Sequence, residues 1–160
     1  MTNINISLRP TQHDEEFLCE VYCSQRRAEV AAFGWETAQQ DAFLRMQFNV
    51  RQQSYKMQFP TAEHSIILID ETPAGSIIVD RSPDHISLTD IAVLPQYQRR
   101  GIATQLLRRL QDEAAHAKKP LVLSVEKSND RAFKLYKACD FEITGESTFS
   151  YSMQWNPAKT

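Results

Sequence analysis

The sequence contains no long hydrophobic run and no excess of positive charge. Within its 160 residues, no apolar stretch approaches the ~20 residues that a membrane-spanning helix requires. Its formal charge is −2 at pH 7, whereas nucleic-acid-binding proteins usually carry a strong positive balance. The opening residues, MTNINISLRP, include no basic segment followed by an apolar stretch, so no secretory signal is expected. We therefore predict a cytoplasmic protein that binds neither nucleic acid nor membranes.

Cysteine is also scarce, with three residues in the chain. So small and odd a number does not predict a disulfide framework. Cys19 and Cys23 are four residues apart in a segment with helical periodicity, which places them on one helix face, and His13 lies nearby in the sequence. Because no second ligand pair follows with the spacing of a zinc site, we predict buried free cysteines and no metal.

The composition is that of an ordinary globular protein, with 42% hydrophobic and 24% charged residues. The chain is long enough to bury a core, and we predict one domain over residues 1–160. Apolar patterns predict strands at residues 4–8, 65–69, 76–79, 86–93, 121–125 and 149–155, and helices at residues 11–30, 37–55, 101–118 and 129–138. Turn-forming residues predict turns at 72–75 and 82–84. This order predicts an α/β fold in which helices flank a mixed sheet.

Glycine is rare, with four residues in the chain, and Gly101 stands between an arginine pair and a helical pattern. The apolar residues after it, Ile102, Leu106, Leu107 and Leu110, recur with helical spacing. The N–H groups in the first turn of a helix have no partner within the helix. Their partial positive charge favours an anion by roughly 0.3–2 kcal/mol. A glycine at the helix start lets the backbone approach such an anion closely.

The neighbours of Gly101 suit a phosphate group. Arg99 and Arg100 supply positive charge in a geometry that phosphates accept. Ala103 has a side chain small enough for a close approach, and Thr104 supplies a hydroxyl. A plain helix start with two solvated arginines explains the same residues. The Walker loop and the three-glycine dinucleotide fingerprint are both absent, so an unrelated nucleotide-binding domain is not predicted.

Two motifs in the second half of the chain resemble those of the GCN5-related N-acetyltransferase (GNAT) family. The segment QRRGIA, residues 98–103, matches the signature Q/R-x-x-G-x-G/A, and residues 88–95 resemble the strand that leads into it. The segment NDRAFKLY, residues 129–136, followed by Phe141, is similar to N-x-x-A-x-x-L-Y-x-x-x-G-F. Together the motifs cover roughly residues 86–142, in the family's order and at its separation.

This resemblance implies acetyl-coenzyme A as a cosubstrate, with its pyrophosphate at the loop and its pantetheine arm paired to the backbone of residues 91–93. It also implies that the fourth and fifth strands pair in parallel and splay apart at the cofactor site. The residues that the resemblance assigns to cofactor binding are Ile91, Ala92, Val93, Gln98, Arg99, Arg100, Gly101, Ile102, Ala103, Thr104, Asn129 and Tyr136. Asn129 is also expected to cap the helix that follows it.

The resemblance further implies direct attack of an amine on the thioester. Tyr136 is placed by the motif to protonate the departing thiolate, a role that typically contributes ~10²–10⁴-fold. The general base is open between Asp90, Glu126, His85 and a chain of waters. Simple alternation puts Asp90 on the face of Leu88 and Ala92, beneath the next helix, whereas a bulge in the strand reverses that face.

One position departs from the family pattern. Asp140 stands where the family has glycine before the phenylalanine. Because aspartate tolerates left-handed backbone better than most residues, the turn is expected to survive.

Taken together, the motifs predict an acetyl-coenzyme A-dependent N-acetyltransferase whose acceptor is a primary amine of a small molecule. A protein or peptide N-acetyltransferase and a noncatalytic coenzyme A-binding sensor are the alternatives, and the presence of Tyr136 favours catalysis. The sequence names neither the acceptor nor the length of the acyl group. It is compatible with a homodimer without deciding the oligomeric state.

Overall fold

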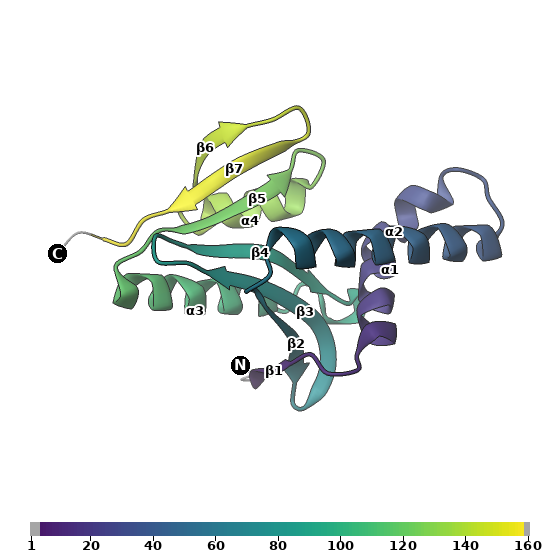
Figure 1. Cartoon of the computed structure of the whole chain (residues 1–160), viewed down its shortest axis with the longest axis horizontal. Coiled ribbons are helices and arrows are strands. Elements are labelled where there is room, and N and C mark those ends of the chain that lie inside the picture. Colours follow the sequence, from purple (N-terminus) through teal and green to yellow (C-terminus); the bar gives the residue numbers. More distant parts are fainter. Residues whose placement is uncertain (1–3, 159–160) are drawn as a thin grey trace. The chain divides into compact units, whose positions relative to one another are not determined.

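The computed structural model describes residues 4–158 of the chain (Figure 1). Their elements are β1 (Ile6–Pro10), α1 (Glu15–Ala31), α2 (Thr37–Gln58), β2 (Glu63–Ile69), β3 (Thr72–Arg81), β4 (Ile86–Val93), the 3-10 helix η1 (Pro95–Tyr97), α3 (Ile102–Ala117), β5 (Leu121–Glu126), α4 (Asp130–Ala138), β6 (Glu142–Glu146) and β7 (Ser150–Trp155). Every predicted helix and strand is present, although several ends differ by a few residues. Between residues 4 and 158, none of these helices is both long and apolar enough to cross a membrane.

The strands form one seven-stranded sheet in the order β1-β2-β3-β4-β5-β7-β6. Strand β5 pairs in parallel with β4 and antiparallel with β7, and β1 pairs antiparallel with β2. The predicted α/β class, a mixed sheet flanked by helices, is confirmed. The parallel pairing of β4 with β5 is also confirmed, as expected when a helix connects two strands of one sheet by a right-handed crossover.

The chain divides into two compact units. The N-terminal unit extends to Ile78 and includes Asp90–Arg100, whereas the C-terminal unit includes Val79–Thr89 and the chain from Gly101 onward. The expectation of one domain over the whole chain stays a prediction.

The core of the N-terminal unit is built from α1, α2 and β2. Its buried residues Leu18, Cys19, Tyr22, Phe48 and Ile66 pack together. On α1 these positions recur with helical spacing, so one helix face is removed from water. Helix α2 begins with a capping box in which Glu36 and Gln39 satisfy each other's backbone N–H groups.

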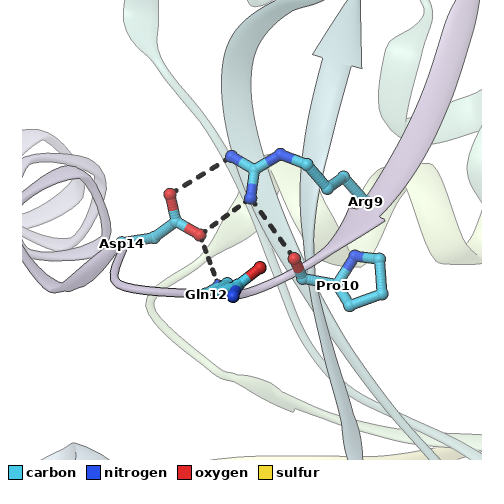
Figure 2. Close-up of polar contacts among 4 residues, drawn as sticks. All are labelled: Arg9, Pro10, Gln12 and Asp14. Carbon is cyan, nitrogen blue, oxygen red and sulfur yellow. Dashed lines mark hydrogen bonds and ion pairs between the residues drawn. The ribbon is translucent and has the colours of Figure 1, made fainter.

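A polar cluster fixes the turn between β1 and α1 (Figure 2). The Asp14 carboxylate accepts two hydrogen bonds from the Arg9 guanidinium, at 3.0 and 3.2 Å, and one from the backbone N–H of Gln12 at 2.7 Å. Arg9 also donates to the carbonyl of Pro10 at 3.3 Å. The hydrogen bonds from Arg9 hold the pKa of Asp14 below its usual range. Asp14, the residue that precedes α1, is thus ionised and links the end of β1 to the start of the helix.

The three cysteines are free, as predicted. The sulfur atoms of Cys19 and Cys23 lie 3.9 Å apart on α1, and Cys19 and Cys139 are buried. Burial raises the pKa of Cys23 to about 11, and the neighbouring Cys19 adds to the effect. A thiol with so high a pKa is a poor nucleophile and metal ligand at neutral pH, which fits a packing role.

The turn predicted at residues 72–75 is wrong, because these residues belong to β3. The chain reverses instead at Asp70 and Glu71, whose φ angles are 48° and 72°. Two consecutive left-handed residues between paired strands form the type I′ turn that suits the twist of a hairpin. The Thr-Pro-Ala-Gly composition indicated a turn, but tertiary packing of the strand prevails over it.

Gly75 on β3 is required by a close approach between strands. A Cβ atom at this position would lie 2.2 Å from the carbonyl oxygen of Ala92 on β4. We therefore expect Gly75→Ala to lower the free energy of unfolding by roughly 1–3 kcal/mol, since the two backbones must move apart. Chemical denaturation of the variant and the unmodified protein measures the difference.

Gly145→Ala is the matched control for this substitution. A Cβ atom at Gly145 on β6 would meet only Ser152, at 3.8 Å, which is an ordinary contact distance. Its effect on the unfolding free energy is expected to be much smaller than that of Gly75→Ala. Equal effects of the two variants would show that the approach to Ala92 does not limit stability.

In the C-terminal unit, α3 buries the apolar stripe that its sequence predicts. Ile102, Leu106, Leu107 and Leu110 are all buried. Buried Gln111 on the same helix donates to the carbonyl of Cys139 at 2.8 Å, so this polar side chain is satisfied in the core.

The end of α4 uses the residue at which the chain departs from the family pattern. Asp140 has a φ of 71°, so the left-handed turn predicted there is confirmed. The backbone N–H groups of Asp140 and Phe141 donate to the carbonyls of Lys137 and Tyr136, at 3.1 and 3.0 Å. These bonds close the helix end, and Phe141 is 1% exposed.

Strand β6 was not expected from the sequence. Its segment EITGE is mostly exposed, and its only large apolar residue, Ile143, is 46% exposed. It pairs antiparallel with β7, and the register shifts between Ile143 and Gly145. An exposed strand at a sheet edge lacks the alternating apolar residues by which strands are predicted.

Candidate functional site

The parallel pairing of β4 with β5 is short. It runs from Ile86↔Leu121 to Leu88↔Leu123, while β4 itself continues to Val93. Burial along β4 also changes phase, because Ile86 and Leu88 are buried and the next buried residue is Val93. The end of the printed pairing at Leu88 agrees with the predicted opening of the sheet, and residues 91–93, to which the resemblance assigns the pantetheine arm, lie beyond it.

Two side chains engage the carbonyl of Val93 at the end of β4. Gln98 donates its amide to this oxygen at 2.9 Å, and Gln25 on α1 donates to it at 3.0 Å. Gln98 is the first residue of the loop signature, and its amide folds the loop back onto the strand. Since this carbonyl is occupied by protein groups, pairing of a ligand's amides with residues 91–93 must use their other backbone groups.

The loop between β4 and α3 contains two residues with left-handed backbone. Arg99 has a φ of 63°, and Gly101, the N-cap of α3, has a φ of 78°. A Cβ atom at Gly101 would meet nothing within 4 Å. Glycine is therefore required here by its backbone conformation, and no protein atom fills the space beside it.

The first turn of α3 presents backbone N–H groups without a capping side chain. The first intrahelical bond of α3 is from the N–H of Gln105 to the carbonyl of Gly101, at 2.9 Å. Gly101 provides no side-chain cap, and the first turn contains no acidic residue. Ile102 points into the core, so only its backbone can reach a ligand, whereas Ala103 and Thr104 are half-buried. This arrangement favours an anion.

The two arginines before Gly101 have different surroundings. Both are exposed, and the guanidinium of Arg100 lies 5.7 Å from the ring centroid of Tyr97 in η1. That contact is within the range of a cation–π interaction and restrains Arg100 near the loop. Exposed guanidiniums are accessible to a phosphate, and they are also typical of a solvated surface.

Asn129 and Tyr136 lie on the motif of α4. The Asn129 side chain accepts a hydrogen bond from the backbone N–H of Ala132 at 3.2 Å, so its predicted capping role is confirmed. Tyr136 is 7% exposed, and its ring centroid lies 5.8 Å from that of Phe141. Its ring is part of the core of the C-terminal unit. Their roles toward a cofactor stay predictions.

The side chain of Asp90 contacts helix α2. Its Oδ1 atom accepts a hydrogen bond from Arg51 Nη2 at 2.8 Å. Of the other candidate bases, Glu126 is exposed at the end of β5, and His85 lies half-buried in a turn where its backbone bonds to Ser82. The Asp90 carboxylate is thus held by the neighbouring positive charge of Arg51.

The groups around Asp90 were not expected from the sequence. The hydroxyl of Tyr55 accepts two hydrogen bonds from Arg51, at 3.1 and 2.7 Å. Burial raises the pKa of Tyr55. Burial lowers the pKa of the half-buried His64, and the charge of Asp90 partly offsets this by raising it. Burial opposes the charge of Arg51, but Asp90 and the two tyrosines keep its pKa above the usual value. No local pattern indicates this cluster, because Arg51 and Asp90 are 39 positions apart.

No metal site is visible in the described part of the chain. Residues 4–158 contain no group of three or more histidine, cysteine, aspartate or glutamate side chains placed to hold a metal ion.

The acetyltransferase (GNAT) family model matches residues 18–141 of the chain. This match covers far more than the two motifs, including α1 and α2. No curated protein sequence matches the chain.

Solved structures with similar folds include several acetyltransferases. The PaiA N-acetyltransferase of Thermoplasma acidophilum, in complex with coenzyme A, aligns with a TM-score of 0.68 and 17% identity, over 95% of this chain and 99% of that one. Spermidine N-acetyltransferase of Vibrio cholerae, in complex with coenzyme A and spermine, aligns with a TM-score of 0.62 and 17% identity, over 94% of this chain and 95% of that one. Ard1 of Thermoplasma volcanium aligns with a TM-score of 0.60 and 16% identity, over 96% of this chain and 99% of that one. At these identities the likeness shows a common fold.

Proposed function

Because the chain belongs to the acetyltransferase (GNAT) family, we propose that it transfers an acetyl group from acetyl-coenzyme A to a primary amine of a small molecule. The observation that carries the proposal is the open N-terminus of α3 behind the left-handed Gly101. There, the N-cap provides no side-chain hydrogen bond, and a Cβ atom at Gly101 would meet nothing within 4 Å. Residues 98–104 are proposed to hold the pyrophosphate, with Arg99 and Arg100 adding charge.

The bound cosubstrate supplies the acetyl group as a thioester, and the residues of this chain handle the protons. The amine nitrogen forms its bond to the carbonyl carbon while the carbon–sulfur bond breaks. Tyr136 gives its hydroxyl proton to the departing sulfur, and Asp90 is proposed to accept a proton from the amine. Asn129 and the backbone of residues 91–93 are proposed to contact the cosubstrate.

A small-molecule acceptor is supported by one of the similar folds, and a second is an N-acetyltransferase whose acceptor is not named. One is described as a spermidine N-acetyltransferase, and its structure contains spermine, which is a small polyamine. The other, PaiA, is described as an N-acetyltransferase. Ard1 has the same fold at a comparable TM-score, so fold likeness alone does not separate one acceptor class from another.

An amine panel tests the proposed function. We expect release of free thiol from acetyl-coenzyme A when the protein is supplied with small primary amines such as polyamines and amino sugars. Peptides with free N-termini or lysines form a second arm of the panel, and turnover confined to them would favour the protein acetyltransferase. Calorimetry with acetyl-coenzyme A runs in parallel. Binding without turnover of any amine would favour the noncatalytic sensor.

A further inference from the structure

We propose that Arg51 is a positioning residue that orients the carboxylate of Asp90 at the end of β4. The inference rests on the proposed function, in which Asp90 accepts a proton from the acceptor amine. Arg51 itself touches neither substrate nor cosubstrate in this account. It acts through Asp90, to which it is joined only by the fold.

The guanidinium of Arg51 is held on several sides. Its Nε and Nη2 atoms donate to the hydroxyl oxygen of Tyr55, at 3.1 and 2.7 Å. Its Cζ atom lies 5.0 Å from the ring centroid of Tyr55 and 5.3 Å from that of Tyr22. Two rings and one phenol oxygen therefore fix both the plane and the rotation of the guanidinium. A flexible surface arginine lacks such contacts. Because α1 and α2 supply these groups, the core of the N-terminal unit sets their places.

Arg51 engages one of the two carboxylate oxygens of Asp90. Nη2 donates to Oδ1 at 2.8 Å, and within residues 4–158 the other oxygen, Oδ2, receives no hydrogen bond from the protein. The Asp90 side chain is 25% exposed and that of Arg51 is 30% exposed. A one-point contact of this kind fixes the direction of the carboxylate and leaves Oδ2 for an incoming N–H group. A two-point contact would have used both oxygens.

Arg45 on the same helix provides a matched control. It forms a two-point pair with Glu16, at 3.2 and 3.0 Å, and both side chains are exposed. This pair also joins an arginine of α2 to a carboxylate, but its carboxylate lies on α1 and not on β4. An exposed ion pair of this type contributes little to stability. Arg45→Gln thus measures what the loss of a merely structural pair does to the rate.

The kinetic test is a double-mutant cycle on kcat with the best amine of the panel. Arg51→Gln is expected to lower kcat by roughly 10–100-fold, the range expected when a catalytic group is misplaced by about 1 Å. In an Asp90→Asn background the same substitution is expected to have no further effect, because its target is gone. Arg45→Gln should leave kcat unchanged in both backgrounds. Full multiplication of the Arg51→Gln and Asp90→Asn effects would overturn the proposal.

A crystal structure of Arg51→Gln gives a readout that does not depend on turnover. The Asp90 carboxylate is expected to leave the position that it holds beside Arg51, whereas it should keep that position in Arg45→Gln. An unmoved carboxylate in Arg51→Gln would overturn positioning whatever the kinetics show. If the unmodified protein turns over no amine, the proposed function fails, and the crystal structures still decide whether Arg51 positions Asp90.

Tyr55→Phe serves where Arg51→Gln does not fold. It removes the oxygen that accepts two hydrogen bonds from Arg51 but keeps the ring. We expect a smaller loss of kcat that disappears in the Asp90→Asn background, together with a shifted Asp90 carboxylate. An unchanged rate and an unmoved carboxylate in Tyr55→Phe would contradict the proposal that Tyr55 holds Arg51 in place to position Asp90.

Discussion

Gly101→Glu is expected to abolish the binding of acetyl-coenzyme A, which the unmodified protein should bind with micromolar-range affinity. A loss of at least ~100-fold corresponds to about 2.7 kcal/mol. The glutamate adds bulk and negative charge where the N–H groups of α3 are proposed to receive the pyrophosphate, so it opposes the anion directly. Isothermal titration calorimetry with acetyl-coenzyme A measures the change.

The fold should survive this substitution with a modest loss of stability. A Cβ atom at Gly101 meets nothing within 4 Å, but a φ of 78° is strained for any residue except glycine, by roughly 1–2 kcal/mol. Gly34 offers a matched control, since its φ is 74° and its Cβ atom would also meet nothing within 4 Å. Gly34→Glu should lower the melting temperature to a similar extent and still bind acetyl-coenzyme A. Equal loss of binding in both variants would refute a phosphate site at Gly101.

Tyr136→Phe is expected to lower kcat by roughly 10²-fold or more, as loss of a general acid does. Only one hydroxyl is removed, and the ring keeps its packing against Phe141, so both the fold and the affinity for acetyl-coenzyme A should change little. Steady-state thiol release over a range from about pH 6 to 9 measures the rate, and calorimetry measures the affinity.

Tyr151→Phe is the control for the loss of a phenol. Tyr151 lies in the C-terminal unit as well, where its ring centroid is 5.4 Å from that of Phe133, and the substitution retains this contact. Its kcat should match that of the unmodified protein. If Tyr136→Phe has the same rate as the unmodified protein across the whole pH range, water is the proton donor and the acid role of Tyr136 is wrong.

Local features of the sequence predicted much of the fold and of the loop. The apolar stripe of α3, the Asn129 cap and the left-handed Asp140 each depend on residues within one or two helical turns. Such features are encoded by spacing and by the backbone preferences of single residues, so they are readable without a partner. The motif around Gly101 is equally local. The structure adds a reason for the glycine that the motif does not state, because the backbone at Gly101 has a φ of 78°.

Features that join distant segments were decided by the tertiary structure. Asp70 and Glu71 form the hairpin turn although Pro73 and Gly75 look more like turn residues, because Gly75 is needed where β3 meets Ala92. The edge strand β6 lacks an apolar face of its own, and its pairing with β7 makes it a strand.

The surroundings of Asp90 show the same limit at the candidate site. Burial along β4 changes phase after Leu88, and the carboxylate of Asp90 meets Arg51 on α2. Neither the phase change nor the partner 39 positions away leaves a local pattern. Residue types and their spacing therefore indicated which residues could carry the chemistry. The packing of α1 and α2 decided which charge Asp90 faces, because only the folded core brings those groups within hydrogen-bond distance.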